Sequence, residues 1–211
     1  GFYNLIMIFF FFLIFRAVAI EFRSKQTSLL WRKAWDMTFS LASFLIGFIL
    51  GLGLGNLIQG VPLDQEGNFI GSFSLFFRPY PILIGLFTTT LFIMHGSIYL
   101  AMKTEGVLHE RLRIWVKLSI FLFVIIYFIT TFSTWMFMPH MVERIQEYRW
   151  LSLVPVAALL AILNVPRLFS LKKDFQAFLF SCLGIILMLV VFGIGTFPNL
   201  VRSLVQPDLL S

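Results

Sequence analysis

Charged residues are scarce in this sequence. Asp, Glu, Lys and Arg make up 12% of the 211 residues, whereas hydrophobic residues make up 59%. Soluble globular domains carry about 25% charged residues, so this deficit excludes an ordinary soluble domain. Aromatic residues reach 18%, which excludes a disordered chain or a coiled coil. The composition is that of an integral membrane protein.

Cysteine and grouped metal ligands are also sparse. Cys182 is the single cysteine and lies in an apolar run, which favours a small packing residue over a redox or metal-binding role. His95, His109 and His140 are expected at different depths, so they do not form a pair of axial haem ligands. No spacing matches a zinc site, a phosphate-binding loop or a Ser-His-Asp set. We therefore predict no catalytic group and no metal bound by this chain.

A starting Met and a basic leader are missing too, because the chain begins "GFYNLIMIFF". A secretory signal peptide needs a positively charged start, so we do not expect this opening to be one. We expect a piece of a longer protein that begins at or just before a transmembrane helix.

Long apolar runs dominate what is present. About 20 apolar residues are needed to cross the hydrocarbon core, and six runs qualify. Helices are favoured over strands because backbone hydrogen bonds must close within each segment. We predict an all-α polytopic protein in which residues 1–211 form a single transmembrane domain. The expected helices are Phe2–Ile20, Met37–Ile58, Pro81–Met102, Ile114–Phe137, Trp150–Pro166 and Phe175–Phe197.

Basic residues are divided unequally between the loops. Twelve of the 16 Lys and Arg residues follow the first, third or fifth expected helix, and four lie on the other side. The positive-inside rule places the richer loops in the cytoplasm and both ends of the chain outside. The net charge of +6 therefore indicates membrane topology and not a nucleic-acid-binding face.

Small residues recur on the second expected helix. Gly47, Gly51 and Gly55 are four residues apart, a spacing that lets another helix backbone approach closely. Helix packing is the favoured interpretation, and a gas or water passage beside this seam is the alternative.

Polar residues share one face of the third expected helix. Thr88 lies seven residues before His95, and Tyr99 lies one turn after it. We interpret these residues as a polar seam that forms hydrogen bonds inside the membrane. Intramembrane ionisable groups are otherwise candidates for function, and that alternative stays open for His95.

The stretch "FFFFLIFRAVAIEFRSK" sets charges at the end of an apolar helix. Glu21 and Lys25 have the i,i+4 spacing that favours an ion pair. Arg16 lies deeper than topology requires and has no carboxylate on its own helix face. It therefore needs to reach water by snorkelling or to bind an anion from another helix. Asp36 is the nearest candidate partner in this chain.

An ordered set of phrases resembles one family. "GFY" opens the first helix, "FRAVAIEFRSK" ends it, and "WRKAWD", "GNLIQGVP", "HGSIYLAMKTEG" and "FPNL" follow in turn. In this order they resemble subunit II of the cytochrome bd family of quinol oxidases over nearly all of residues 1–203. The resemblance implies nine transmembrane helices, arranged as two four-helix bundles plus one. This chain would supply the third to the eighth, so the first two helices, with their embedded acids, and the last helix would lie outside it.

The resemblance also implies a function. It indicates a respiratory terminal oxidase of the bacterial cytoplasmic (inner) membrane that oxidises quinol, reduces O2 to water, and separates charge without pumping. Haems b and d are expected in subunit I. This chain is expected to be the haem-free partner that stabilises subunit I in an obligate heterodimer and helps form proton and O2 access routes. A small single-helix subunit and membrane lipid are further expected partners, and nucleic acid is not.

The resemblance assigns roles to individual residues as well. Arg16 matches the family arginine after the third helix, and Glu21 matches the acidic position that follows it. Arg16 would be the counter-ion of the acids on the two preceding helices, with Glu21 and Asp36 in the same proton-access region. Two other classes stay open: half of a secondary transporter, for which the glycine-rich second helix is the one hint, and a membrane scaffold without a redox partner.

Overall fold

The fold is almost entirely helical. A computed structural model describes residues 2–64 and 69–198, and within these ranges the extended structure is limited to one isolated bridge between Leu63 and Phe69. Six helices are long and apolar enough to cross a membrane, which confirms the predicted all-α polytopic class. They are α1 (Phe2–Arg23), α2 (Leu29–Gln59), α3 (Pro79–Met102), α4 (Gly106–Phe137), α6 (Leu153–Ser170) with the turn η2 (Arg149–Ser152) before it, and α7 (Asp174–Thr196).

Two of these helices begin well before the predicted apolar spans. α2 begins at Leu29, where the sequence indicated Met37, and α4 begins at Gly106, where it indicated Ile114. The added turns contain charged residues, which count against a membrane span but are compatible with a helix that continues into the aqueous interface. Two short elements were not predicted: η1 (Phe73–Phe77) and α5 (His140–Glu147).

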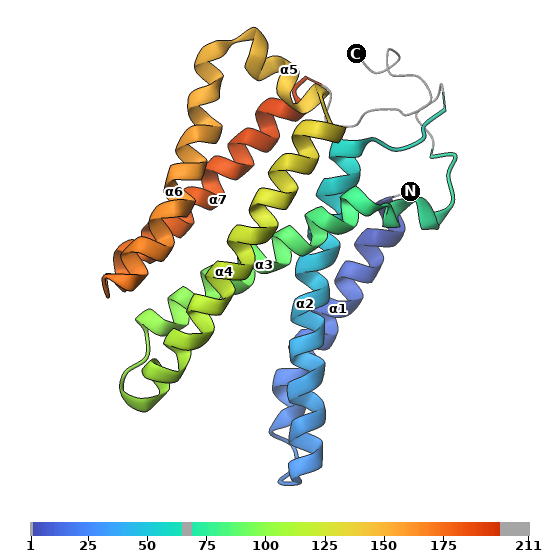
Figure 1. Cartoon of the computed structure of the whole chain (residues 1–211). Coiled ribbons are helices and arrows are strands. Elements are labelled where there is room, and N and C mark those ends of the chain that lie inside the picture. The colour runs from blue at the N-terminus through green and yellow to red at the C-terminus, as the bar shows by residue number, and fades with distance from the viewer. Residues whose placement is uncertain (1, 65–68, 199–211) are drawn as a thin grey trace. The chain divides into compact units, whose positions relative to one another are not determined.

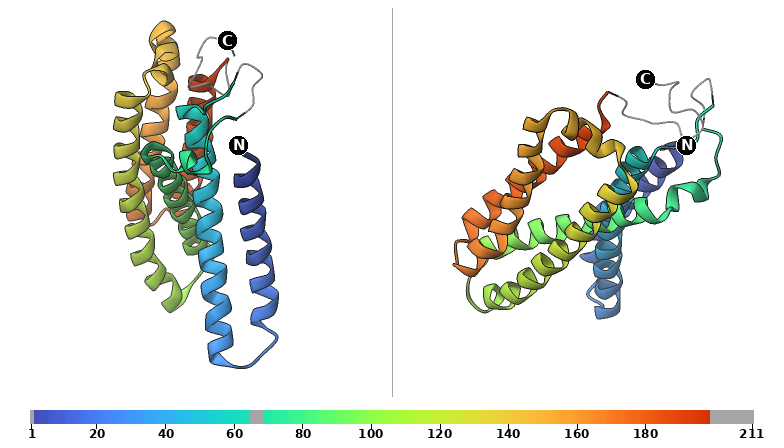
Figure 2. Two further views of the ribbon diagram at one scale, coloured as in Figure 1. Left: turned by 90° about the vertical axis from the view of Figure 1, so that its right-hand side faces the viewer. Right: turned by 45° about the horizontal axis from the view of Figure 1, so that its top comes forward.

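The chain divides into two compact units within α3, after Thr89. The first unit holds α1, α2, η1 and the beginning of α3, and the second holds the rest of α3 and all later helices (Figure 1). In the first unit, α1 and α2 run antiparallel and side by side, as the left view of Figure 2 shows. In the second unit, α6 and α7 form a similar antiparallel pair.

Local contacts end the helices of the first unit. Trp31 Nε1 donates a hydrogen bond to the carbonyl of Phe22 at 2.7 Å, which satisfies one of the carbonyls that the end of α1 leaves free. α2 ends at Gly60, whose φ of 83° is accessible to glycine, and the Gly60 N–H donates to the Asn56 carbonyl at 2.9 Å. Pro79 then begins α3, where a missing N–H costs nothing.

α1 has the least cover from its own chain. In this helix Leu5 and Ala19 are buried, whereas Tyr3, Ile6 and Ile14 are more than half exposed. An apolar helix face of this kind needs lipid or further helices around it.

Candidate functional site

Arg16 lies on an exposed part of α1. Its guanidinium carbon is 5.3 Å from the centroid of the Phe39 ring, which is the geometry of a cation–π contact. In the described part of the chain, no carboxylate lies within 4.0 Å of it. The charge of Arg16 thus has an aromatic neighbour on α2 and no carboxylate counter-ion among these residues.

Asp36 and Glu21 each face a different cation. Arg23 Nε donates to Asp36 Oδ1, and Arg23 Nη2 lies 3.4 Å from Asp36 Oδ2. Glu21 Oε1 lies 3.7 Å from Lys25 Nζ, which confirms the predicted i,i+4 ion pair. The structure therefore forms no ion pair among Arg16, Glu21 and Asp36. Asp36 instead pairs with Arg23, and Glu21 pairs with Lys25.

The glycine seam of α2 lies against the first part of α3. Gly47, Gly51 and Gly55 are all buried. A Cβ added at Gly51 would lie 2.6 Å from the Ile84 carbonyl oxygen and would also clash with the Thr88 hydroxyl. A Cβ at Gly55 would lie 2.6 Å from the Cα of Pro81. These positions permit a backbone-to-backbone approach that any side chain would prevent.

Replacing Gly51 by Ala should test this approach directly. Because the added methyl group meets backbone, α3 has to move, and we expect a loss of about 1–3 kcal/mol in the free energy of unfolding. Unfolding in mixed detergent micelles, followed by circular dichroism, measures the loss. Gly53→Ala is the matched control, since a Cβ at Gly53 has nothing within 4 Å. Equal stability of the two variants would contradict the close approach.

The polar residues of α3 have separate contacts. In the first unit, Thr88 is buried and donates its hydroxyl to the Ile84 carbonyl at 2.9 Å. In the second unit, His95 Nδ1 lies 2.8 Å from Ser181 Oγ on α7. The rings of His95 and Tyr99 both contact Phe178, with centroid distances of 4.9 Å and 5.6 Å. The structure thus brings His95 and Tyr99 together against α7.

A glutamine at His95 should preserve this contact. Its side-chain amide can bond the Ser181 hydroxyl, and the resemblance to the cytochrome bd family implies that the haems belong to another subunit. We therefore expect normal assembly and an unchanged haem content. Pyridine haemochrome analysis of purified protein measures the haem. A loss of haem in His95→Gln, with normal haem in Ser181→Ala, would instead identify His95 as a ligand.

An ionic cluster that the sequence did not single out lies in the second unit. Arg113 Nη1 of α4 lies 3.3 Å from Asp174 Oδ1 at the start of α7, and both side chains are largely buried, with 13% and 16% exposed. Arg113 Nη2 donates to the Phe169 carbonyl at 2.9 Å, and its guanidinium carbon lies 4.6 Å from the Phe169 ring centroid. His109 Nε2 lies 4.0 Å from Asp174 Oδ2.

This cluster, which we call the Arg113 cluster, connects the ends of four helices. His109 Nδ1 lies 2.9 Å from the Ala101 carbonyl in the last turn of α3. Because a carbonyl can only accept, Nδ1 is the donor in this hydrogen bond, and Nε2 faces Asp174. Phe169 lies in the last turn of α6. The loops after the third and fifth predicted helices lie on the same side of the membrane. This topology could have indicated from the sequence that Arg113 and Asp174 lie at the same membrane surface.

A second polar cluster lies in the first unit, around Asn56. Asn56 is fully buried, and its Nδ2 donates to the Phe76 carbonyl at 2.9 Å. Arg78 Nη2 donates to the Gly60 carbonyl at 2.6 Å and lies 3.3 Å from Asn56 Oδ1. Burial lowers the pKa of the Arg78 guanidinium from its ordinary value. These bonds fix the segment that joins α2 to α3.

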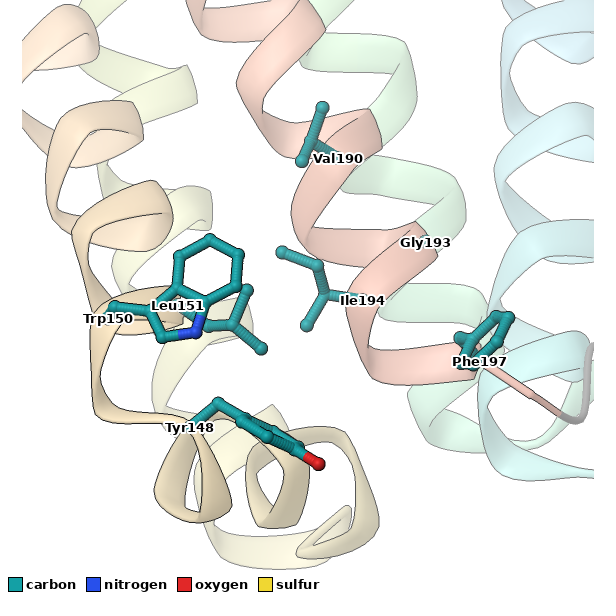
Figure 3. Close-up of a pocket in the computed structure, with 7 residues that line it drawn as sticks. All are labelled: Tyr148, Trp150, Leu151, Val190, Gly193, Ile194 and Phe197. Atoms are coloured by element: carbon teal, nitrogen blue, oxygen red, sulfur yellow. The ribbon is translucent and has the colours of Figure 1, made fainter.

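An apolar cleft lies beside the last turns of α7 in the second unit (Figure 3). Its volume is about 560 Å³. Trp150 and Ile194 face each other across it, and the Tyr148 hydroxyl and the Trp150 indole nitrogen are the polar side-chain atoms of its lining. Among the described lining residues, the Tyr148 hydroxyl is the one ionisable group, and most of the surface is apolar, so the cleft offers space for an apolar group. The lining residues are Tyr148, Trp150, Leu151, Val190, Gly193, Ile194 and Phe197.

The described residues define a class of protein. Six apolar helices, with ion pairs at the helix ends, make a multi-pass helical membrane protein. Within residues 2–64 and 69–198, no group of three or more His, Cys, Asp and Glu residues could hold a metal ion. What the described residues show is contact between apolar helices, with polar clusters at the helix ends.

Comparison with known proteins identifies the family within this class. A family model described as cytochrome bd terminal oxidase subunit II matches residues 1–208, and the chain belongs to this family. The resemblance carried by the phrases of the sequence is confirmed.

Curated relatives carry matching names. The chain is 34% identical over 117 residues to cytochrome bd-I ubiquinol oxidase subunit 2 of Escherichia coli K12, covering 54% of this chain and 31% of that protein. It is 36% identical over 98 residues to cytochrome bd ubiquinol oxidase subunit 2 of Bacillus subtilis, covering 46% and 29%. A probable cytochrome oxidase subunit 2 of Haemophilus influenzae is 31% identical over 117 residues, covering 54% and 31%. The matched stretches span about a third of the relatives' length.

Proposed function

We propose that this chain acts as subunit II of a cytochrome bd-type terminal oxidase in a bacterial inner membrane. Such a complex couples quinol oxidation to the reduction of O2 to water. The observation that carries the proposal is the family match across residues 1–208, together with six apolar helices. The names of the relatives, which describe ubiquinol oxidase subunits, support the same activity.

In this proposal the chain is a non-catalytic partner. Haems b and d belong to subunit I, and this chain stabilises subunit I in a heterodimer. One observation supports a partner role: α1 leaves most of its apolar surface uncovered. Helices of another subunit, or further helices of the complete protein, would cover that surface.

Arg16 has a specific role in this proposal. It lies on the sparsely covered helix α1, and its nearest acids are held by other cations: Asp36 by Arg23, and Glu21 by Lys25. A cation inside an apolar helix is stabilised when it pairs with an acid of another segment. We propose that embedded acids of neighbouring helices pair with Arg16 and form a hydrated proton-access route with it. On the positive-inside rule, this route opens to the cytoplasm.

Co-expression with a haem-bearing subunit I tests the proposal. The complete protein that contains this chain, expressed with its genomic neighbour, should yield a membrane complex with a haem d absorption band and quinol-dependent O2 consumption. Omitting the chain should abolish both. A complex that shows the full spectrum and activity without this chain would reject the oxidase role. Uptake of a solute without any haem spectrum would favour the transporter class.

A further inference from the structure

We propose that the first three turns of α4 bind an anionic phospholipid, with the phosphate held by Arg111, Arg113 and Lys117. These three cations line one surface pocket of about 360 Å³ on α4, together with Val107, Glu110 and Ile114. Glu110 lies in the lining with the three cations, and Asp174 pairs with Arg113. Two carboxylates therefore meet three cations, which leaves the pocket with an excess of one positive charge. Its charge is complementary to a phosphate group.

The pocket contains a guanidinium whose position is already fixed. Arg113 is held by Asp174, by the Phe169 carbonyl and by the Phe169 ring, and its side chain is 13% exposed. An arginine has five N–H donors in a planar fork. In the described structure, Arg113 makes its hydrogen bonds through its two terminal nitrogens. Because these bonds already order the guanidinium, donating a further hydrogen bond to a phosphate oxygen would need little additional ordering.

The surface of α4 beyond the pocket indicates a lipid rather than a free phosphate. Ile114, Leu118, Phe121 and Ile125 follow each other at helical spacing and are 72%, 48%, 62% and 40% exposed. Eleven residues of α-helix measure about 16 Å, and one leaflet of the hydrocarbon core measures about 15 Å. The helix therefore presents cations at headgroup level and an apolar stripe one acyl chain long below them.

Lipid retention tests the site. The membrane-extracted complex is purified in mild detergent, and its bound lipids are measured by native mass spectrometry. We expect phosphatidylglycerol to be retained by the unmodified protein, and the double variant Arg111→Gln/Lys117→Gln to bind it roughly thirtyfold more weakly, since each basic side chain contributes electrostatic attraction at the membrane surface. The double variant Arg32→Gln/Lys33→Gln removes the same two residue types from exposed positions of α2 and should retain the lipid.

Two further measurements distinguish a loss of charge from a loss of folding, and binding of a lipid from binding of free phosphate. Arg111→Lys/Lys117→Arg keeps both charges and should retain phosphatidylglycerol, so a loss there would contradict a charge-based site. The exposed Trp115 should change its emission with phosphatidylglycerol nanodiscs and not with phosphatidylcholine nanodiscs or inorganic phosphate. Equal responses to all three would overturn the proposal, as would an unmodified complex that carries no anionic lipid.

Discussion

Asp174→Asn is expected to lower the free energy of unfolding by about 3 kcal/mol, because it leaves the largely buried Arg113 without its counter-charge. Asparagine has nearly the same shape, so packing changes little. The remaining Arg113 contacts, to the Phe169 carbonyl and ring, do not neutralise the guanidinium. Resistance to unfolding in mixed detergent micelles measures the effect.

Two companion variants make the Asp174 result specific. Glu110→Gln removes an exposed carboxylate from the same end of α4 and should change stability by less than about 0.5 kcal/mol. The double variant Arg113→Met/Asp174→Leu replaces the pair by apolar groups and should recover most of the lost stability. If Asp174→Asn were as stable as Glu110→Gln, the pair would be no more than a surface contact.

Arg16→Leu in the complete oxidase is expected to reduce quinol-dependent O2 consumption at least tenfold. The reason is electrostatic: the proposed embedded acids would lose their counter-ion, favour their neutral form and no longer conduct protons. Haem d content should be measured alongside O2 uptake, because a lost ion pair between helices can also impair assembly.

The Arg16 prediction has its own controls. Arg16→Lys keeps the charge and should retain a large part of the activity. Arg32→Leu removes an exposed arginine from the start of α2 and should leave both activity and haem d unchanged. Full activity and normal haem d in Arg16→Leu would reject the counter-ion hypothesis while leaving the oxidase role in place.

The apolar helices were predictable because their physics is local. A run of about 20 apolar residues has few alternatives to a transmembrane helix, and the Phe-rich stretch of α1 needs no partner to be recognised. The helix ends were less predictable. The charged turns of α2 and α4 lie before the apolar runs, and a helix that leaves the membrane is not marked by hydropathy.

Contacts within one helix could be predicted from the sequence, whereas contacts between helices could not. The pair between Glu21 and Lys25 was predictable because four residues separate them on one helix. Asp36 was a candidate partner for Arg16, but the antiparallel pairing of α1 with α2 sets it against Arg23. The register between two helices decides which cation an acid meets, and composition and spacing do not contain that register.

The sequence by itself determined the membrane class, six helices, the alternation of their loops and the family, since each of these depends on residue type and order along the chain. Only the tertiary structure decided which polar groups meet. Arg113 and Asp174 are 61 residues apart and pair because the first turns of α4 and α7 lie beside the last turn of α6. A Cβ at Gly51 would meet the α3 backbone, whereas a Cβ at Gly53, two residues further along the same helix, would have nothing within 4 Å. Contacts of this kind depend on how helices pack. Successive residues of a helix point in different directions around its axis, so a small rotation of the helix can turn a buried position into an exposed one.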